Sequence, residues 1–104
     1  MNQQEKQEPP ELSLTDSEII ERASKAKNGD KFRSLFSGEW RSWSYPSQSE
    51  ADLALANLLC WWCGGNRGMM ERLFRSSGMY RNEHKMNNAI RVACQSATAY
   101  FRGR

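Results

Sequence analysis

Hydrophobic residues recur every three or four positions through most of the chain after residue 14, which is the spacing of one face of an α-helix. The first such segment begins with a capping-box pattern, Thr15 followed by Glu18. It ends at Asn28-Gly29, a pair that suits the left-handed backbone found after many helices. These signals predict a first helix between Thr15 and Gly29.

A short second helix is predicted next, with Asp30 as its cap and Gly38 as its end. Residues 39–46 then form a loop, in which three aromatic residues are interleaved with Arg41. These residues are Trp40, Trp43 and Tyr45. They either fold back onto the bundle as core anchors, which is the favoured alternative, or form a surface on which bases stack.

The longest predicted helix runs from residues 47–50 to about Cys63. Ser47 and Glu50 form a second capping box, and Ser49 with Asp52 is an alternative cap pair. Apolar residues surround this helix on nearly every side, so we expect it to be the buried centre of a bundle. Gly64-Gly65 ends it.

Two more helices complete the prediction. The fourth begins at Asn66 or Gly68 and ends at residues 76–78, where two serines precede a glycine. The fifth has an apolar stripe made of Met86, Ile90, Ala93, Cys94, Ala97 and Tyr100 or Phe101. With no strand pattern in the sequence, we predict an all-α bundle of about five helices over residues 14–104.

Residues 1–13 differ from the rest, because they are polar and contain Pro9-Pro10, which predicts a disordered acidic tail or linker. Residues 1–21 contain six acidic residues against Lys6, a net charge of −5, and residues 22–104 contain fourteen Lys and Arg against six acidic residues, a net charge of +8. A basic region of this kind favours an anionic partner, nucleic acid first, although a solvated basic face is the simpler alternative.

Three cysteines cannot form a closed disulfide framework, and the polar N-terminus does not resemble a secretory signal. The longest apolar run, Leu58–Cys63, is far shorter than the roughly 20 residues that cross a membrane. We therefore expect a soluble protein of the cytoplasm without a membrane partner.

The sequence gives little sign of a metal or catalytic centre. A zinc site is conceivable from four residues: Cys60, Cys63, Cys94 and His84. Both members of the C-x-x-C pair lie in an apolar helix, however, so core packing is the better interpretation and we expect no metal. Because His84 is the only histidine and no nucleophile has an activating neighbour, we expect no catalytic residue.

Residues 64–68 are rich in glycine but lack the Lys-Ser/Thr pair of a phosphate-binding loop, so they are more simply a helix end and a new start. Amides there could still receive a phosphate beside Arg67. Residues 67–104 contain eight basic residues and only two acidic ones, Glu71 and Glu83. Their predicted phosphate-binding group lies around the turn that ends the fourth helix and comprises Arg72, Arg75, Ser76, Ser77 and Arg81.

Three sequence blocks resemble the helix-bundle domain that follows the archaeo-eukaryotic primase, or primase-polymerase, core in plasmid and phage replication proteins. The blocks are residues 29–40 (GDKFRSLFSGEW), residues 47–55 (SQSEADLAL) and residues 73–81 (LFRSSGMYR). One departure is clear: relatives tend to have a Lys-Trp pair soon after the third block, where this chain has residues 82–85 (NEHK).

The resemblance implies a non-catalytic module that helps a primase engage single-stranded template DNA and an initiating nucleotide, ATP or another NTP. The catalytic domain, with its metal-binding carboxylates, would be supplied in cis or in trans. Further expected phosphate contacts are Lys31, Arg33 and Lys85, and the expected edge of a pocket is Ser47, Gln48 and Asp52. The alternative is a protein-interaction bundle that docks through the loop from Trp40 to Tyr45, and a small helix-turn-helix regulator is weaker.

Overall fold

A computed structural model describes residues 11–97 and residue 101. These residues form five α-helices and no strand, which confirms the predicted all-α bundle. The helices are α1 (Asp16–Lys25), α2 (Gly29–Phe36), α3 (Gln48–Trp62), α4 (Arg67–Ser76) and α5 (Glu83–Ser96), and a 3₁₀ turn, η2 (Arg41–Trp43), lies in the loop before α3. The predicted tail falls mostly outside the described residues.

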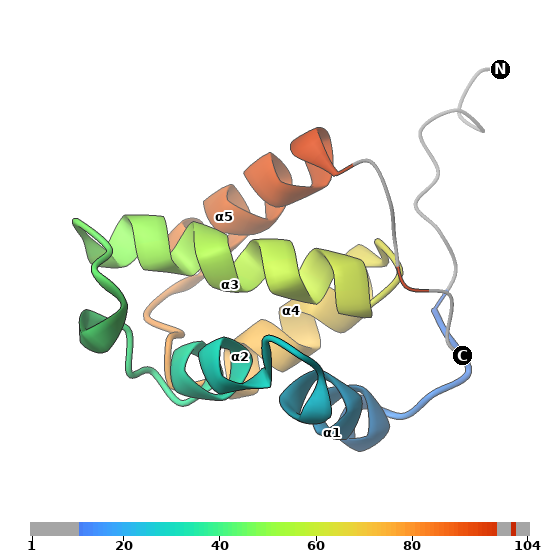
Figure 1. The fold of residues 1–104 in the computed structure, drawn as a ribbon. Helices are drawn as coiled ribbons and strands as arrows, with labels where there is room; N and C mark the ends of the chain where they lie inside the picture. Colours follow the sequence, from blue (N-terminus) through green and yellow to red (C-terminus); the bar gives the residue numbers. More distant parts are fainter. Residues whose placement is uncertain (1–10, 98–100, 102–104) are drawn as a thin grey trace, which may run out of the picture.

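Helix α3 lies at the centre of the bundle (Figure 1). It packs against α5, α4 and α2, while α1 packs on α2, so α5 and the α1–α2 pair flank α3 on opposite sides. The core between them contains one or more fully buried residues from every helix. Its largest side chains are Ile19, Phe32, Leu35, Leu55, Leu59, Met69, Met70, Leu73, Phe74, Met79, Met86 and Ile90.

Local caps begin most of these helices where the sequence predicts them. Thr15 and Glu18 form the complete capping box at α1. The hydroxyl of Ser47 accepts a hydrogen bond from the Glu50 amide at 3.3 Å, and the side chain of Asn66 accepts one from the Met69 amide at 2.9 Å. The alternative cap pair, Ser49 with Asp52, is wrong, because Ser49 lies inside α3 and the Asp52 side chain is buried in an ion pair.

The boundary between α1 and α2 differs from the prediction. Helix α1 already ends at Lys25, and Gly29 is the first residue of α2 rather than a helix stop. A Cβ at Gly29 would lie 2.1 Å from the Ser24 carbonyl oxygen, so glycine is needed there because the two helices approach closely. Asp30 is not the cap, because it lies inside the first turn of α2 and pairs with Arg33.

The aromatic loop and the C-terminal segment complete the core. Trp40 and Tyr45 are half-buried and pack against the core, as predicted, but Trp43 is exposed. Phe101 is not part of α5, which ends at Ser96. Its ring instead stacks on Trp61 with 5.2 Å between ring centroids, and its amide donates to the Trp61 carbonyl.

The described start of the chain lies against the same end of α3. Leu12 packs on the core, and a Cβ at Gly64 would lie 3.1 Å from the Leu12 side chain. Gly64 and Gly65 have φ values of 64° and 80°, which supports their predicted role as the helix stop. In the part of the chain that is described, no helix has the length and apolar character needed to cross a membrane.

Candidate nucleic-acid interface

Arg72, a predicted phosphate contact on α4, is surrounded by carboxylates. Its guanidinium donates to Asp16 at 3.0 Å from both Nε and Nη2, and to Glu11 at 2.9 Å from Nη1 and 3.2 Å from Nη2. The hydrogen bond from Arg72 lowers the pKa of Glu11, and the two carboxylates raise the pKa of Arg72. The acidic start of the chain therefore occupies the guanidinium that was expected to bind phosphate.

Arg75, one turn further along α4, is engaged in the same way. Its Nε and Nη2 each donate to Glu83 at 2.8 Å, and Glu71 lies 3.6 Å from Nη2. Tyr80 donates its hydroxyl hydrogen to the same Glu83 carboxylate at 2.8 Å. Hydrogen bonds from Arg75 and Tyr80 lower the pKa of Glu83 to about 2, so this carboxylate stays ionised at any pH at which the protein would act.

Arg81, in the turn before α5, reaches across to α3 and pairs with Asp52, of which only 4% of the side chain is exposed. The pair accounts for Oδ2 of Asp52, while Oδ1 is buried and accepts no hydrogen bond from the described residues. Burial raises the pKa of Asp52, although Arg81 and Lys85 act in the opposite direction.

The two serines of the predicted phosphate-binding group also have intramolecular partners. Ser76 donates its hydroxyl hydrogen to the Leu73 carbonyl at 2.9 Å, and Ser77 donates to the Phe74 carbonyl at 2.7 Å. These bonds satisfy carbonyls at the end of α4. The group thus divides into separate contacts, each with its own intramolecular partners, rather than converging on one anion site.

The two basic residues predicted on α2 have different surroundings. Arg33 donates to the Asp30 carboxylate and to the Ser24 carbonyl, so it joins α2 to α1. Lys31 instead lies over the ring of Tyr45, with 5.4 Å between Nζ and the ring centroid. Lys31 also lines a hollow in the described surface.

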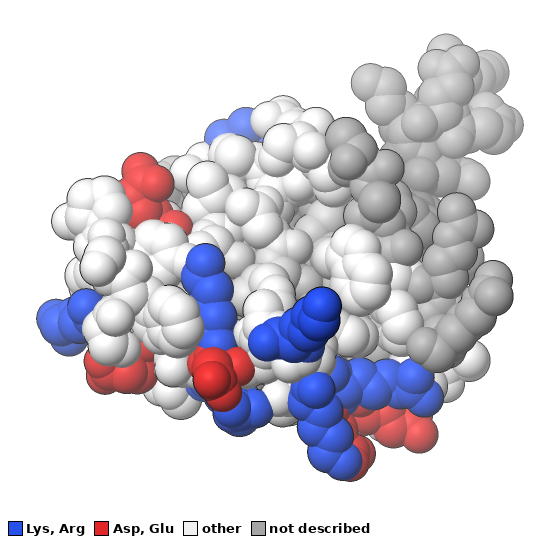
Figure 2. All heavy atoms as spheres, viewed as in Figure 1, with Lys and Arg blue, Asp and Glu red and all other residues white. Residues whose placement is uncertain are grey.

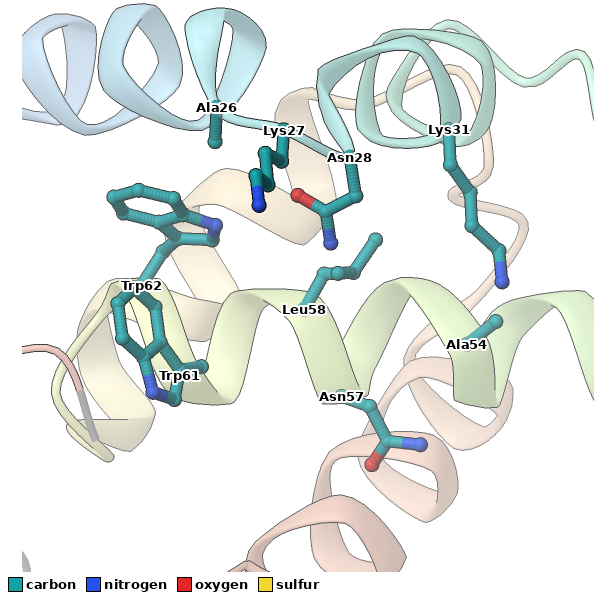
Figure 3. A pocket seen from close by; sticks show the side chains of 9 residues that line it. All are labelled: Ala26, Lys27, Asn28, Lys31, Ala54, Asn57, Leu58, Trp61 and Trp62. Carbon is teal, nitrogen blue, oxygen red and sulfur yellow. The ribbon is translucent and has the colours of Figure 1, made fainter. Parts of the chain in front are cut away.

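This hollow, the Lys27–Trp61 pocket, has a volume of about 570 Å³ and lies where the turn between α1 and α2 faces α3. Figure 3 shows Lys27, Asn28 and Lys31 on one side, directed toward α3. The other side is mainly apolar. Its lining residues are Ala54, Asn57, Leu58, Trp61 and Trp62, whereas Ala26 lies beside Lys27 on the first side.

The charge and exposure of this pocket set it apart from the arginine contacts. Neither Lys27 nor Lys31 forms an ion pair within residues 11–97, and 40% of Trp61 is exposed. Figure 2 shows basic side chains gathered over the α1 and α2 side of the molecule, with acidic ones among them. An exposed aromatic ring beside unpaired cations is the combination that binds single-stranded nucleic acid.

Sequence reasoning singled out Lys31 but missed the pocket, because it placed Trp61 and Trp62 together in the buried centre. The sequence did contain a signal for the exposure of one of these tryptophans. Adjacent positions on a helix point about 100° apart, so two neighbouring tryptophans do not both face one core.

The predicted pocket edge is only partly assembled. Ser47 is the cap of α3 and Gln48 is its first residue, whereas Asp52 lines a second pocket between α3 and α5. Lys85, another predicted contact, lines this same pocket, which has a volume of about 240 Å³. Its remaining lining residues are Ser49, Glu50, Leu53, His84, Asn88, Ala89 and Val92.

Of the four residues considered for zinc, the Cys60 and Cys94 thiols contact one another. Cys60 and Cys63 are buried, and burial raises the pKa of each thiol to about 12, so both remain protonated. The Cys94 thiol lies 3.7 Å from the Met70 sulfur. Among the described residues, no three His, Cys, Asp or Glu side chains are close enough together to hold a metal ion.

Comparison with protein families matches residues 48–102 to the family described as the NrS-1 polymerase HBD domain, a helical bundle domain. The matched segment is more than half of the chain and contains α3, α4 and α5. Of the three blocks noted in the sequence, residues 29–40 precede it. Neither the curated proteins nor the solved structures contain a match.

The Asp52–Arg81 pair generates a prediction about stability. Arg81→Met leaves the buried Asp52 carboxylate unpaired, so we expect the free energy of unfolding to fall by about 2–4 kcal/mol. Asp52→Leu combined with Arg81→Met removes both charges and should recover most of this loss. Urea unfolding followed by circular dichroism measures Arg81→Met, Asp52→Leu and the double variant, and a double variant as unstable as the sum of the two single substitutions would contradict the assignment.

The Arg75–Glu83 contact generates a prediction about pH. Because the pKa of Glu83 is lowered from 4.5 to about 2, its contribution to stability is fully present above pH 4.5 and is lost as the pH falls toward 2. Glu83→Gln should therefore be less stable than the native chain at pH 7, and the difference should shrink by pH 3. Urea midpoints at the two pH values provide the measurement. Glu39→Gln, which removes a glutamate with no ion pair in the described structure, is the control, and an equal deficit for Glu83→Gln at both pH values argues against the contact.

Proposed function

The chain belongs to the family of the NrS-1 polymerase HBD domain, and on this premise we propose that it is an accessory module of a phage or plasmid primase-polymerase. It would engage single-stranded template DNA and an initiating nucleotide, ATP or another NTP, during primer synthesis in the cytoplasm. The module itself has no catalytic role in this proposal. A catalytic domain, in cis or in trans, carries out the chemistry.

The observation that carries the proposal is the Lys27–Trp61 pocket. Trp61 is 40% exposed although Phe101 stacks on its ring, and an unpaired base can stack on the part that Phe101 leaves open. Each stacked base contributes about 1–3 kcal/mol to binding in single-strand-binding proteins. The ammonium groups of Lys27 and Lys31 lie on the opposite side of the pocket, where they can contact the phosphates that flank this base. A volume of about 570 Å³ is also within the range of pockets that hold small ligands, so a nucleotide fits the same site.

The paired arginines have a secondary role in this proposal. Arg72 and Arg75 would bind phosphate only by exchanging it for the carboxylates that hold them, and Arg81 would expose a buried charge by leaving Asp52. Lys27 and Lys31 have no such competitor among residues 11–97. We therefore assign the first phosphate contacts to the lysines.

The two lysines generate the first test. Fluorescence anisotropy with a labelled 12-mer of single-stranded DNA should show an affinity that falls with salt, with a slope of about 0.7 per neutralised phosphate. Lys27→Gln with Lys31→Gln should weaken binding and reduce this slope by about 1.4. The matched control is Arg22→Gln with Arg41→Gln, which removes the same charge from two cations that also form no ion pair in the described residues and lie outside the pocket. Equal losses in both double variants would mean that net charge, not this site, determines binding.

The exposed tryptophans generate the second test, because Trp61 and Trp43 have similar exposed fractions, 40% and 36%, at different ends of α3. Trp61→Ala should weaken binding to DNA by about 5- to 150-fold, the value of one lost base stack. Trp43→Ala should leave it unchanged. The reverse result would favour the interpretation in which the loop from Trp40 to Tyr45 is the surface on which bases stack. No DNA binding by the native chain, together with a pull-down of the catalytic domain that Trp43→Ala abolishes, would favour the protein-interaction alternative.

A further inference from the structure

The pocket between α3 and α5, here the Asp52 pocket, lies on the other side of α3 from the Lys27–Trp61 pocket. Its wall contains Asp52 from α3, and Lys85 and Asn88 from α5. Its volume of about 240 Å³ is below the range of about 300–1,000 Å³ typical of pockets for drug-sized ligands. It therefore suits a single ring rather than a complete nucleotide.

Asp52 lacks one hydrogen bond in this pocket. Only 4% of its side chain is exposed, Oδ2 accepts from Arg81, and Oδ1 is buried without a donor among the described residues. A buried acceptor without a partner is destabilising, and native proteins retain few of them. The missing partner is a donor, and a bound molecule with an N–H group would supply it.

The other polar groups of the pocket narrow the class of that molecule. Lys85 donates only, and the Ser49 hydroxyl both donates and accepts. The Asn88 Oδ1 already accepts from Arg91 at 2.6 Å, so the NH₂ group of Asn88 remains to donate. Two carboxylates, Glu50 and Asp52, lie in the same wall and disfavour a phosphate. The polar side chains of the pocket therefore complement a neutral ring that has a hydrogen-bond donor next to an acceptor.

We propose that the Asp52 pocket binds one unpaired cytosine of the template, with its exocyclic N4–H group donating to Asp52 Oδ1, so that Asp52 determines base specificity. This inference rests on the proposed function, because it concerns the same single-stranded DNA. Carboxylates accept from cytosine N4 in protein–DNA complexes. Lys85 and Asn88 are available to donate to the ring nitrogen N3, which lies beside the amino group, and to the carbonyl O2 that follows it. Thymine has the same size but would place its O4 acceptor against Oδ1.

The test compares the affinity of the full chain for oligo(dT) 12-mers with the affinity for the same oligomers in which cytosine replaces thymine at one position at a time. For the native chain we expect tighter binding, about tenfold, when the cytosine is at the position that enters the pocket. Asp52→Asn keeps an oxygen for Arg81 and presents an N–H donor in place of Oδ1, so the preference should invert toward thymine. Such an inversion cannot result from unfolding.

Two further variants keep the result interpretable if Asp52→Asn does not fold. Asn88→Trp places a large side chain at an exposed position of the pocket wall without changing the Asp52–Arg81 pair, and it should abolish the preference for cytosine. Lys27→Gln with Lys31→Gln should weaken both oligomers equally and leave their ratio unchanged. Equal affinities for all oligomers would overturn the cytosine site alone, whereas no binding of any oligomer would overturn the proposed function and this inference together.

Discussion

The structure depends on one constraint: α3 is apolar on almost every side, and four short helices have to cover it. Helices α5, α4 and α2 pack directly on α3, and the C-terminal segment adds Phe101 over its last turn. The coverage is incomplete on the side where α1 turns into α2. Ala54, Leu58 and Trp61 line the Lys27–Trp61 pocket there. The incomplete coverage of this apolar helix thus creates the pocket that the proposed function assigns to the ligand.

Intramolecular ion pairs determine which basic residues are available to a ligand. The carboxylates that hold Arg72, Arg75 and Arg81 come from the start of α1, the start of α5 and the first half of α3. The pairs of Arg72 and Arg81 join parts of the chain that are distant in sequence, whereas Arg75 and Glu83 are eight positions apart. Exposed pairs of this kind contribute little to stability, and the largest share belongs to the buried Asp52–Arg81 pair. Among the cations that form no ion pair in the described part of the chain, Lys27 and Lys31 line the Lys27–Trp61 pocket, which explains why the proposal depends on them.

The sequence predicted the helices well because the signals that begin and end them are local. The capping box at Thr15 and the glycine stop at Gly64 involve residues no more than a few positions apart. The start of α5 was not predicted, although Asn82 accepts a hydrogen bond from the Lys85 amide and is an ordinary cap. The α1–α2 boundary was misplaced because Gly29 serves close packing, which spacing along the sequence does not indicate.

The candidate site was much less predictable, because it depends on partners far apart in the chain. Arg81 binds Asp52, 29 positions away, and Arg72 binds Glu11, 61 positions away. Composition identified a basic surface but not which cations are already neutralised. The exposure of Trp61 could have been inferred from its neighbour Trp62, since only one of them can face the core, but which one does so depends on the position of α1 and α2.

The most direct test of the central claim uses the four tryptophan indole N–H signals of the ¹⁵N-labelled chain, recorded by NMR during titration with single-stranded DNA. If DNA binds in the Lys27–Trp61 pocket, the Trp61 and Trp62 signals shift progressively and those of Trp40 and Trp43 stay in place. Shifts confined to Trp40 and Trp43, or no shift at a DNA concentration that saturates the anisotropy, would contradict the account.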